Sequence, residues 1–428
     1  MNIAVVGLGY VGLPLALHFA RSGVVVMGLD IDPEKAAALN AGRSYIRHIP
    51  AELVAAEVDA GRFRATTDFA AVRHVEAVII CVPTPLTPNR EPDLSYILNT
   101  GRTIAPFLQR GALVVLESTT YPGTTDTDLR AVLEQGSGLK AGTDFHLAFS
   151  PEREDPGNPD SRVAEIPKVV GGYTPACLER AQALYAPAIR TLVPVSSCRV
   201  AEATKLLENI FRSVNIALVN ELKLVYGAMG IDVWEVIHAA RTKPFGYMPF
   251  YPGPGLGGHC LPIDPFYLTW KAREYGQTAR FVELAGEVNT AMPAHVFHVT
   301  TDALNARRKP VNGSRVLLVG LAYKPNVDDL RESPAFALFD LFHAHGAEVA
   351  YHDPYIPVIG ATREHAQWKG LQSVAWTADN ISRFDAVVIV TAHAAVTHAD
   401  LVSWADCIVD TRDALAGAAP RPGQVWKA

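Results

Sequence analysis

Short apolar runs and helical stretches alternate through the first half of the chain. The opening stretch, NIAVVGLGYVGLPLALHFARSGVVVMGLDID, predicts a strand, a glycine-rich turn, a helix and a second strand that ends in an acid. Further apolar runs at AVIICVPTP, ALVVLEST and FHLAFSPE read as strands that end in turn residues. This alternation of strands and helices predicts a doubly wound parallel sheet.

From about Ala201 the spacing of apolar residues becomes helical. The stretch AEATKLLENIFRSVNIALVNELKLVYGAMG contains no proline, and its first glycine is Gly227, so it predicts one long helix. Further helices are expected around 232–240 and 281–308. The middle of the chain is therefore predicted to be a helical domain.

After RRKPVNGS the opening pattern returns. RVLLVGLAYKP parallels NIAVVGLGYVG, a helix follows around 335–345, and AEVAYHD and DAVVIVTAH read as strands. The turn lacks the second glycine of the first one, so we expect it to bind a different ligand. The predicted fold is α/β, with two Rossmann-like parallel-sheet domains joined by a helical middle domain. The expected boundaries are 1–198, 199–308 and 309–428.

Composition agrees with a soluble globular protein of more than one domain. The chain has 428 residues, 49% hydrophobic and 19% charged, with a net charge of −6. Such a balance gives no sign of a surface for nucleic acid or an anionic membrane, so an anionic ligand would need locally gathered basic residues. No apolar run approaches the ~20 residues of a membrane span. We expect a cytoplasmic protein without a signal peptide.

The five cysteines are widely spaced, odd in number and without a CxxC pair. This argues against a disulfide framework and against a zinc ribbon, and no metal site is expected.

The first turn carries the pattern G-x-G-x-x-G at Gly7, Gly9 and Gly12. These glycines permit a tight turn, close approach of a pyrophosphate, and packing of helix on strand. About twenty residues on, Asp30 can accept hydrogen bonds from a ribose 2′-OH and would repel a 2′-phosphate, so NAD is favoured over NADP. The alternative is a glycine-rich turn with a surface aspartate.

The stretch YPGPGLGGHC places Cys260 at the end of a permissive loop, with Asp264 close behind. A thiol there is a candidate nucleophile, although a free cysteine is more often a buried small hydrophobe. The other four cysteines lie in or beside apolar patterns and suit that second interpretation.

Two further segments carry candidate polar groups. Lys205 and Asn209 are four residues apart and share a helix face, on which Glu202 and Arg212 extend a polar stripe. Such a stripe is commonly solvated. Glu152 in SPERE follows a strand end, where it is either a general base or ribose contact, or an acid at a helix start.

These segments together resemble the UDP-glucose/GDP-mannose dehydrogenase family, the nucleotide-sugar 6-dehydrogenases. The resemblance rests on GLGYVGLPLA, CVPTP, ESTTYPGTT, SPEREDPG, EATKLLENIFRSVNIALVNEL, PGPGLGGHCLPIDP and YKPNVDDLRESP, in this order over nearly the whole chain. It implies an N-terminal NAD domain, a middle domain that forms a homodimer or higher homo-oligomer, and a C-terminal domain for the UDP part of a UDP-sugar. The implied reaction oxidises a sugar C6 alcohol to a carboxylate with two NAD, for surface polysaccharide precursors.

The resemblance also implies residue roles. Cys260 would capture the intermediate aldehyde, and Lys205 and Asn209 would stabilise the oxyanion. Thr119, Glu152 and Asp264 would position water and move protons. The implied cofactor contacts are Gly7, Gly9, Tyr10, Val11, Gly12, Asp30, Lys35, Thr84, Thr119 and Arg331. The implied substrate contacts are Glu152, Arg153, Lys205, Asn209, Arg241, Tyr251, Gly257 and Lys324.

Two departures from the UDP-glucose enzymes favour a branch that acts on N-acetylhexosamines. Ile263 stands where many of those enzymes have lysine, and SPEREDPG is tighter than their corresponding segment, which leaves the role of Glu154 open. UDP-N-acetylglucosamine is the expected substrate, with UDP-N-acetylmannosamine or UDP-glucose as alternatives. More distant alternatives are a single-step hydroxyacid or 6-phosphogluconate-type dehydrogenase, and a non-catalytic NAD sensor.

Overall fold

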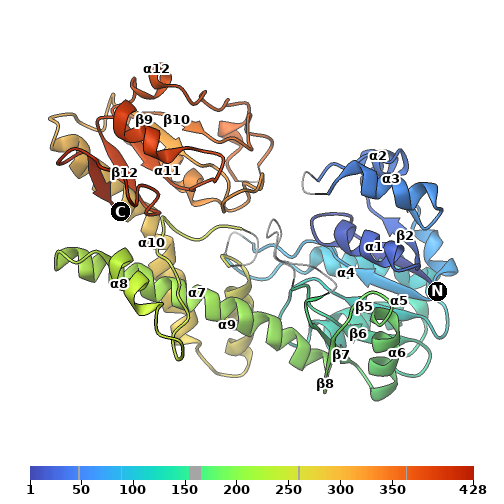
Figure 1. Cartoon of the computed structure of the whole chain (residues 1–428). Helices are drawn as coiled ribbons and strands as arrows, with labels where there is room; N and C mark the ends of the chain where they lie inside the picture. The colour runs from blue at the N-terminus through green and yellow to red at the C-terminus, as the bar shows by residue number, and fades with distance from the viewer. Residues whose placement is uncertain (47–48, 88, 154–164, 259–260, 363) are drawn as a thin grey trace. The chain divides into compact units, whose positions relative to one another are not determined.

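A computed structural model describes residues 1–428 apart from 47–48, 88, 154–164, 259–260 and 363 (Figure 1). Its internal contacts divide the chain into two compact units. The first unit contains residues 1–209 and 266–278, and the second contains residues 210–265 and 279–428.

An eight-stranded sheet forms the centre of the first unit, in the order β3-β2-β1-β4-β5-β6-β7-β8. Its strands pair in parallel except β6 with β7, which are antiparallel. The strands are β1 (Asn2–Val6), β2 (Val25–Leu29), β3 (Phe63–Thr66), β4 (Ala77–Ile80), β5 (Leu113–Leu116), β6 (His146–Phe149), β7 (Lys168–Gly172) and β8 (Leu192–Val195).

Helices cover both faces of this sheet, because successive side chains of a strand point to opposite faces. Ile3 and Val5 join one apolar cluster with helices α1, α2, α3 and α6, and Ala4 and Val6 join another with α4 and α5. The helices are α1 (Gly12–Arg21), α2 (Pro33–Asn40), α3 (Ala51–Asp59), α4 (Ser95–Ile104), α5 (Arg130–Ser137) and α6 (Pro175–Tyr185).

The middle of the chain is helical, as its apolar spacing predicts. The long helix α7 (Cys198–Ala228) has 31 residues and passes from the first unit into the second. Three more helices follow: α8 (Val233–Ala240), α9 (Asp264–Glu274) and α10 (Arg280–Asn305). Asp232 caps α8, since its side chain accepts a hydrogen bond of 2.9 Å from the backbone N–H of Trp234.

A parallel five-stranded sheet lies in the second unit, in the order β10-β9-β11-β12-β13. The strands are β9 (Arg315–Val319), β10 (Glu348–His352), β11 (Ala386–Ile389), β12 (Ile408–Asp410) and β13 (Val425–Lys427). Its helices are α11 (Pro334–Ala344), α12 (Ala378–Ile381) and α13 (Leu401–Trp404). The predicted fold class, two Rossmann-like sheets with a helical middle domain, is confirmed.

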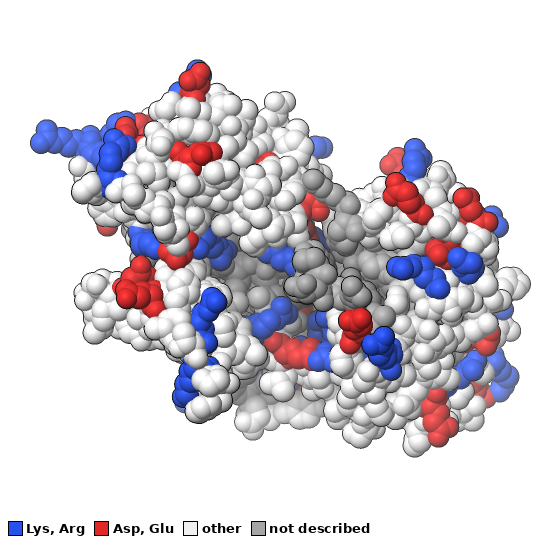
Figure 2. All heavy atoms as spheres, in the orientation of Figure 1, with Lys and Arg blue, Asp and Glu red and all other residues white. Residues whose placement is uncertain are grey.

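Charged side chains of both signs are interspersed on the face shown in Figure 2, in keeping with the small net charge. Within the described part of the chain, no helix is both long and apolar enough to cross a membrane.

Candidate active site

The turn between β1 and α1 needs its first and third glycines for different reasons. Gly7 has φ +89°, a conformation that favours glycine, and a Cβ on Gly12 would lie only 1.8 Å from the Gly7 carbonyl oxygen. A Cβ on Gly9 would meet no atom within 4 Å. The third glycine therefore allows the helix to pack on the turn, while the second leaves open space above it.

Asp30 follows β2 and faces this turn. Its carboxylate accepts hydrogen bonds from the backbone N–H groups of Leu8, at 2.9 Å, and Asp32, at 3.0 Å. The ammonium of Lys35 lies 3.6 Å from the same carboxylate. Because Asp30 is only 6% exposed, the alternative of a surface aspartate is wrong.

The other predicted cofactor residues of the first unit lie at the ends of strands or in the turn. Tyr10 and Val11 are half-buried in the turn, Thr119 is half-buried after β5, and Thr84 is buried after β4. The carbonyl oxygen of Thr84 accepts a hydrogen bond of 2.8 Å from the Tyr267 hydroxyl, which ties α9 to this loop.

Lys205 and Asn209 on α7 are both buried, with 8% and 0% exposed. The alternative of a solvated stripe is therefore wrong for these two residues, although Arg212, one turn further on, is exposed. A buried ammonium and a buried amide on one helix face are suited to stabilising negative charge.

Glu202, one turn before Lys205, anchors α7 to the loop after β5. Its carboxylate accepts hydrogen bonds from the backbone N–H groups of Gly123, at 2.7 Å, and Thr125, at 2.9 Å, and from the Thr125 hydroxyl at 2.7 Å. Burial raises the pKa of Glu202 to about 7, although these hydrogen bonds oppose the shift. The residue thus fixes the start of the helix that carries Lys205 and Asn209.

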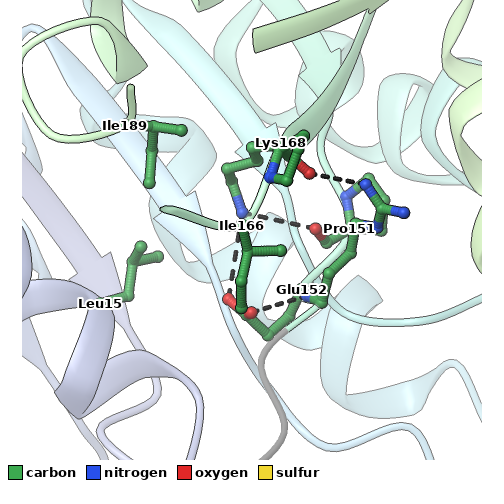
Figure 3. A pocket seen from close by; sticks show the side chains of 8 residues that line it. Leu15, Pro151, Glu152, Ile166, Lys168 and Ile189 are labelled. Carbon is green, nitrogen blue, oxygen red and sulfur yellow. Dashed lines mark hydrogen bonds and ion pairs between the residues drawn. The ribbon is translucent and has the colours of Figure 1, made fainter. Parts of the chain in front are cut away.

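Glu152 and Arg153 follow β6 and line a small pocket (Figure 3). The Glu152 carboxylate lies 3.9 Å from the Lys168 ammonium. The Arg153 guanidinium pairs with Glu208 of α7 at 2.7 Å. Glu154 lies outside the described residues, as does the segment that would decide whether a helix starts here.

In the second unit the glycine-rich loop is packed against protein atoms. A Cβ on Gly253 would lie 2.3 Å from the Arg412 guanidinium, and a Cβ on Gly257 or Gly258 would lie 2.7 Å from Tyr323. The backbone N–H of Gly258 donates to the Arg331 carbonyl at 3.0 Å. The glycines thus let the loop lie close to the segment after β9.

The remaining predicted residues of the second unit are spread around this loop. Tyr251 stacks on Trp234 with ring centroids 5.8 Å apart, and the Arg241 guanidinium donates to its hydroxyl at 3.3 Å. The Arg331 guanidinium pairs with Asp329 at 2.6 Å. Lys324 and Gly257 are half-buried, and Asp264 is buried. Cys260 lies outside the described residues.

Two basic side chains, Lys223 and Arg412, lie against the same loop at Gly253. The Lys223 ammonium donates one long hydrogen bond, 3.5 Å, to the Gly253 carbonyl. Burial lowers the pKa of Lys223 to about 7, and the charge of Arg412 adds to the shift. Burial, with a smaller effect of Lys223, lowers the pKa of His295 to about 4. His295 is therefore neutral at neutral pH, and the repulsion between the buried Lys223 ammonium and the Arg412 guanidinium favours binding of an anion.

Comparison with known proteins now identifies the chain. The family models of the UDP-glucose/GDP-mannose dehydrogenase family match as the NAD binding domain at residues 1–189, the central domain at 199–291 and the UDP binding domain at 317–417. The chain belongs to the UDP-glucose/GDP-mannose dehydrogenase family. It is an NAD-dependent nucleotide-sugar dehydrogenase, an oxidoreductase.

Three relatives illustrate the similarity. A UDP-N-acetyl-D-glucosamine 6-dehydrogenase of Pseudomonas aeruginosa is 37% identical over 92% of this chain and 90% of its own. A UDP-N-acetyl-D-mannosamine dehydrogenase of Escherichia coli K12 is 36% identical over 92% of this chain and 93% of its own. The solved structure of a UDP-D-ManNAc dehydrogenase from Pyrococcus horikoshii has a TM-score of 0.89 at 33% identity, over 100% and 99% of the two chains.

The glycine turn of this dehydrogenase fits NAD. The open space at Gly9 leaves room for a pyrophosphate beside the N-terminus of α1, where backbone N–H groups favour negative charge. The prediction of NAD as cofactor is confirmed at the level of the family.

Sequence reasoning did not find two groups of residues in this dehydrogenase. Lys223 and Arg412 are about 190 residues apart, so no local pattern joins them. Arg412 does follow strand β12, and its place at a strand end was the available signal. The second group is the pair of Lys168 and Glu117, which the fold brings together at 3.0 Å from the start of β7 and the end of β5.

Proposed function

We propose that the enzyme oxidises the C6 alcohol of a UDP-N-acetylhexosamine to the carboxylate, with UDP-N-acetylglucosamine as its substrate. Each turnover consumes two NAD and one water and yields two NADH. NAD, when bound, accepts the two electrons and the hydrogen of each oxidation step.

The sugar assignment rests on two kinds of support. Ile263 and the tight segment SPEREDPG depart from the UDP-glucose pattern, and the Pseudomonas aeruginosa relative is named for UDP-N-acetyl-D-glucosamine. The Escherichia coli relative, at nearly the same identity, makes UDP-N-acetyl-D-mannosamine the second candidate.

The second oxidation needs a nucleophile, because an aldehyde has no good hydride to give until a group adds to it. Cys260 supplies that nucleophile in our proposal, by way of the family resemblance. Its thiolate adds to the aldehyde to form a thiohemiacetal, which is oxidised to a thioester, and water then releases the acid and the thiol.

The buried pair of Lys205 and Asn209 is the observation that carries this chemistry. Both side chains project from one face of α7 and are almost fully excluded from water. A preorganised ammonium and amide in such surroundings stabilise an alkoxide far better than the same groups in solvent. We assign them to the oxyanion of the thiohemiacetal and of the thioester hydrolysis step.

Glu152, Thr119 and Asp264 complete the proposed proton chemistry. Glu152 is the base for the water that attacks the thioester, while Thr119 and Asp264 orient water and substrate. Lys223 and Arg412, with Lys324, are proposed to hold the diphosphate of the nucleotide, because they gather positive charge beneath the glycine-rich loop.

Helix α7 also supports the proposed homodimer. Leu207, Phe211, Leu218 and Val225 share one face and are 67%, 46%, 50% and 47% exposed. An exposed apolar stripe of this length indicates a protein interface. Light scattering of the purified protein tests the dimer.

We also propose that the chain is divided into domains at 1–198, 199–308 and 309–428.

The decisive experiment is a panel of UDP-sugars scored for NADH and for carboxylate. We expect two NADH per carboxylate, no free aldehyde, and the highest rate with UDP-N-acetylglucosamine. Cys260→Ala should still bind NAD but form almost no acid. A preference for UDP-glucose would overturn the sugar assignment alone, while acid formation by Cys260→Ala near the normal rate would overturn the mechanism.

Lys205→Ala separates catalysis from binding. We expect kcat to fall by an amount typical of one lost oxyanion donor, roughly 2.7–4 kcal/mol in the barrier, with little change in UDP-sugar affinity. Arg212→Ala, an exposed change on the same helix, is the matched control and should leave kcat near normal. Equal values of kcat for the two variants would remove Lys205 from the mechanism.

A further inference from the structure

A buried ion pair lies directly beneath Glu152. The Lys168 ammonium is 3.0 Å from the Glu117 carboxylate, and the two side chains are 6% and 0% exposed. The Tyr185 hydroxyl donates to the same carboxylate. The Lys168 ammonium also lies 5.0 Å from the centre of the Tyr185 ring. Both charges are thus held inside the first unit, away from solvent.

This ion pair joins two strand ends. Glu117 directly follows β5 and lies two residues before Thr119, while Lys168 opens β7. The Lys168 ammonium donates to the Pro151 carbonyl at 3.4 Å and lies 3.9 Å from the Glu152 carboxylate (Figure 3). One ammonium therefore contacts the backbone just before Glu152 and the Glu152 side chain itself.

Lys168 keeps its positive charge beside Glu117 and Glu152. Burial disfavours the ammonium, but the nearby carboxylates of Glu117 and Glu152 outweigh that effect and raise the pKa of Lys168. Its positive charge is thus available to orient the Glu152 carboxylate at neutral pH.

A buried ion pair is not an obvious means of stabilising a fold. Its desolvation commonly offsets the attraction, and apolar replacements of similar volume are often neutral or stabilising. Beyond its contact with Glu117, Lys168 contacts the Pro151 carbonyl and the Glu152 carboxylate. These two contacts point to a role of the ion pair in orienting the Glu152 carboxylate.

We propose that Lys168, held by Glu117, is a positioning residue that orients Glu152 toward the attacking water. This inference rests on the proposed function, in which Glu152 acts as the base for thioester hydrolysis. Lys168 does not touch the substrate in this arrangement, and it acts only through Glu152.

The test uses the full-length enzyme and the neutral double variant Lys168→Met/Glu117→Gln. We expect NAD affinity to be kept and two NADH to form rapidly in the first turnover, while steady-state kcat falls roughly 10- to 100-fold, as for a misplaced catalytic group. The acyl-enzyme should then accumulate and be visible by intact-protein mass spectrometry. A purely structural role would not produce a selective block at hydrolysis.

A matched control removes another ion pair of the same unit. Glu57 lies on α3 and Arg62 in the turn after it, and their ion pair has a distance of 2.7 Å and a buried carboxylate. The double variant Arg62→Met/Glu57→Gln removes this pair and should leave kcat near normal. If the first double variant is unstable, the exchanged pair Lys168→Glu/Glu117→Lys keeps a buried ion pair while opposing Glu152 with a negative charge. It should show the same block.

Combination with Glu152→Gln separates the possible outcomes. If Lys168 acts through Glu152, adding Lys168→Met/Glu117→Gln to an enzyme that already carries Glu152→Gln should lower kcat little further. If Glu152→Gln is impaired but the Lys168 variants show normal kcat, the positioning role is wrong and the proposed function stands. Normal kcat in Glu152→Gln would overturn both the base and its positioning residue, and absence of NADH with every UDP-sugar would overturn the proposed function itself.

Discussion

The turn after β1 and the turn after β9 are built on the same plan. Gly7 and Gly320 both have φ +89°, and each donates its N–H at 2.8 Å to the carbonyl of the last residue of the adjacent strand, Leu29 of β2 and His352 of β10. A Cβ at either glycine would lie within 2.5 Å of a carbonyl oxygen. The first glycine of the pattern is therefore a requirement of the strand-turn geometry, whatever the ligand.

The acids that follow the second strand of each sheet in chain order, Asp30 and Asp353, differ in how many hydrogen bonds they accept from their own domain. Asp30 accepts two backbone hydrogen bonds among the described residues, from Leu8 and Asp32. Asp353 accepts four backbone N–H groups and faces the ring Nε2 of His393 at 3.0 Å. The first acid keeps capacity for a ribose hydroxyl, whereas the second is occupied by its own domain.

The later positions of the two turns differ as well. Gly9 and Gly12 correspond to Ala322 and Pro325 in the second turn. Close approach of a pyrophosphate thus depends on the second glycine, and the third lets the helix pack closely on the turn. The second turn keeps its first glycine and its shape without either of them. The comparison shows that a Rossmann-like turn becomes a dinucleotide site only through these additions.

Replacing Asp353 should produce the largest effect. Asp353→Ala leaves four backbone N–H groups and His393 without their acceptor, and we expect the second unit to lose about 3–5 kcal/mol of stability. Hydrogen exchange of the amides in β9 and β10 measures this loss, while NAD affinity should be unchanged. Burial alone would raise the pKa of Asp353, but His393 and the backbone N–H groups lower it, so its stabilisation should hold at neutral pH and fade only below about pH 4.

The corresponding change in the first unit should affect binding. Asp30→Ala removes a charged hydrogen-bond acceptor, and such bonds contribute roughly 1.5–3 kcal/mol. We expect kcat/KM for NAD to fall and NADP to be relatively favoured, because the charge that repels a 2′-phosphate is gone. Comparable kcat/KM of the unaltered enzyme with NAD and NADP would contradict this assignment.

Exchanging the second residue of the pattern tests the turn itself. Gly9→Ala gives the first turn the residue that the second turn has at the corresponding position, Ala322. The added Cβ would have no protein atom within 4 Å. The melting temperature should therefore hold, while crowding of the pyrophosphate weakens NAD binding by roughly 1–3 kcal/mol. Ala322→Gly is the matched control and should not create a second NAD site in calorimetry.

The smallest effect concerns pH and the second unit. Lys223 has a pKa of about 7, so it is charged below pH 7 and loses its proton as the pH rises. If it holds a diphosphate, UDP-sugar affinity should fall about tenfold between pH 6 and pH 8, with uptake of a proton on binding. Calorimetry in Cys260→Ala avoids turnover. Lys223→Met should flatten the dependence, whereas Lys369→Met, an exposed change in the same unit, should preserve it.

Most of the fold could be predicted from local pattern. The helix over Cys198–Ala228 follows from apolar spacing without a breaker, and the central strands β1, β4 and β5 appear as short apolar runs. Strands β3, with sequence FRAT, and β8, with sequence LVPV, are less fully buried and were not predicted. The antiparallel pairing of β6 with β7 could not be predicted, because pairing direction depends on the path of the chain and not on the composition of a strand.

The candidate site could be predicted only where its residues form local motifs. Gly7, Gly9 and Asp30 are linked by a fixed spacing, and Lys205 and Asn209 by one helical turn. Lys168 with Glu117, and Lys223 with Arg412, are joined only by the folded chain. Whether a charged residue is solvated or buried depends on tertiary packing, which local spacing does not contain.

The buried Lys223 ammonium and the Arg412 guanidinium beside the glycine-rich loop have a consequence for the lifetime of the protein. Holding Lys223 away from water beside Arg412 disfavours the folded second unit, and a bound polyanion would relieve that repulsion. If the nucleotide binds there, the enzyme should resist proteolysis when its substrate is abundant and be degraded sooner when the supply falls. The amount of enzyme in the cell would then follow the availability of the sugar nucleotide without any change in its synthesis.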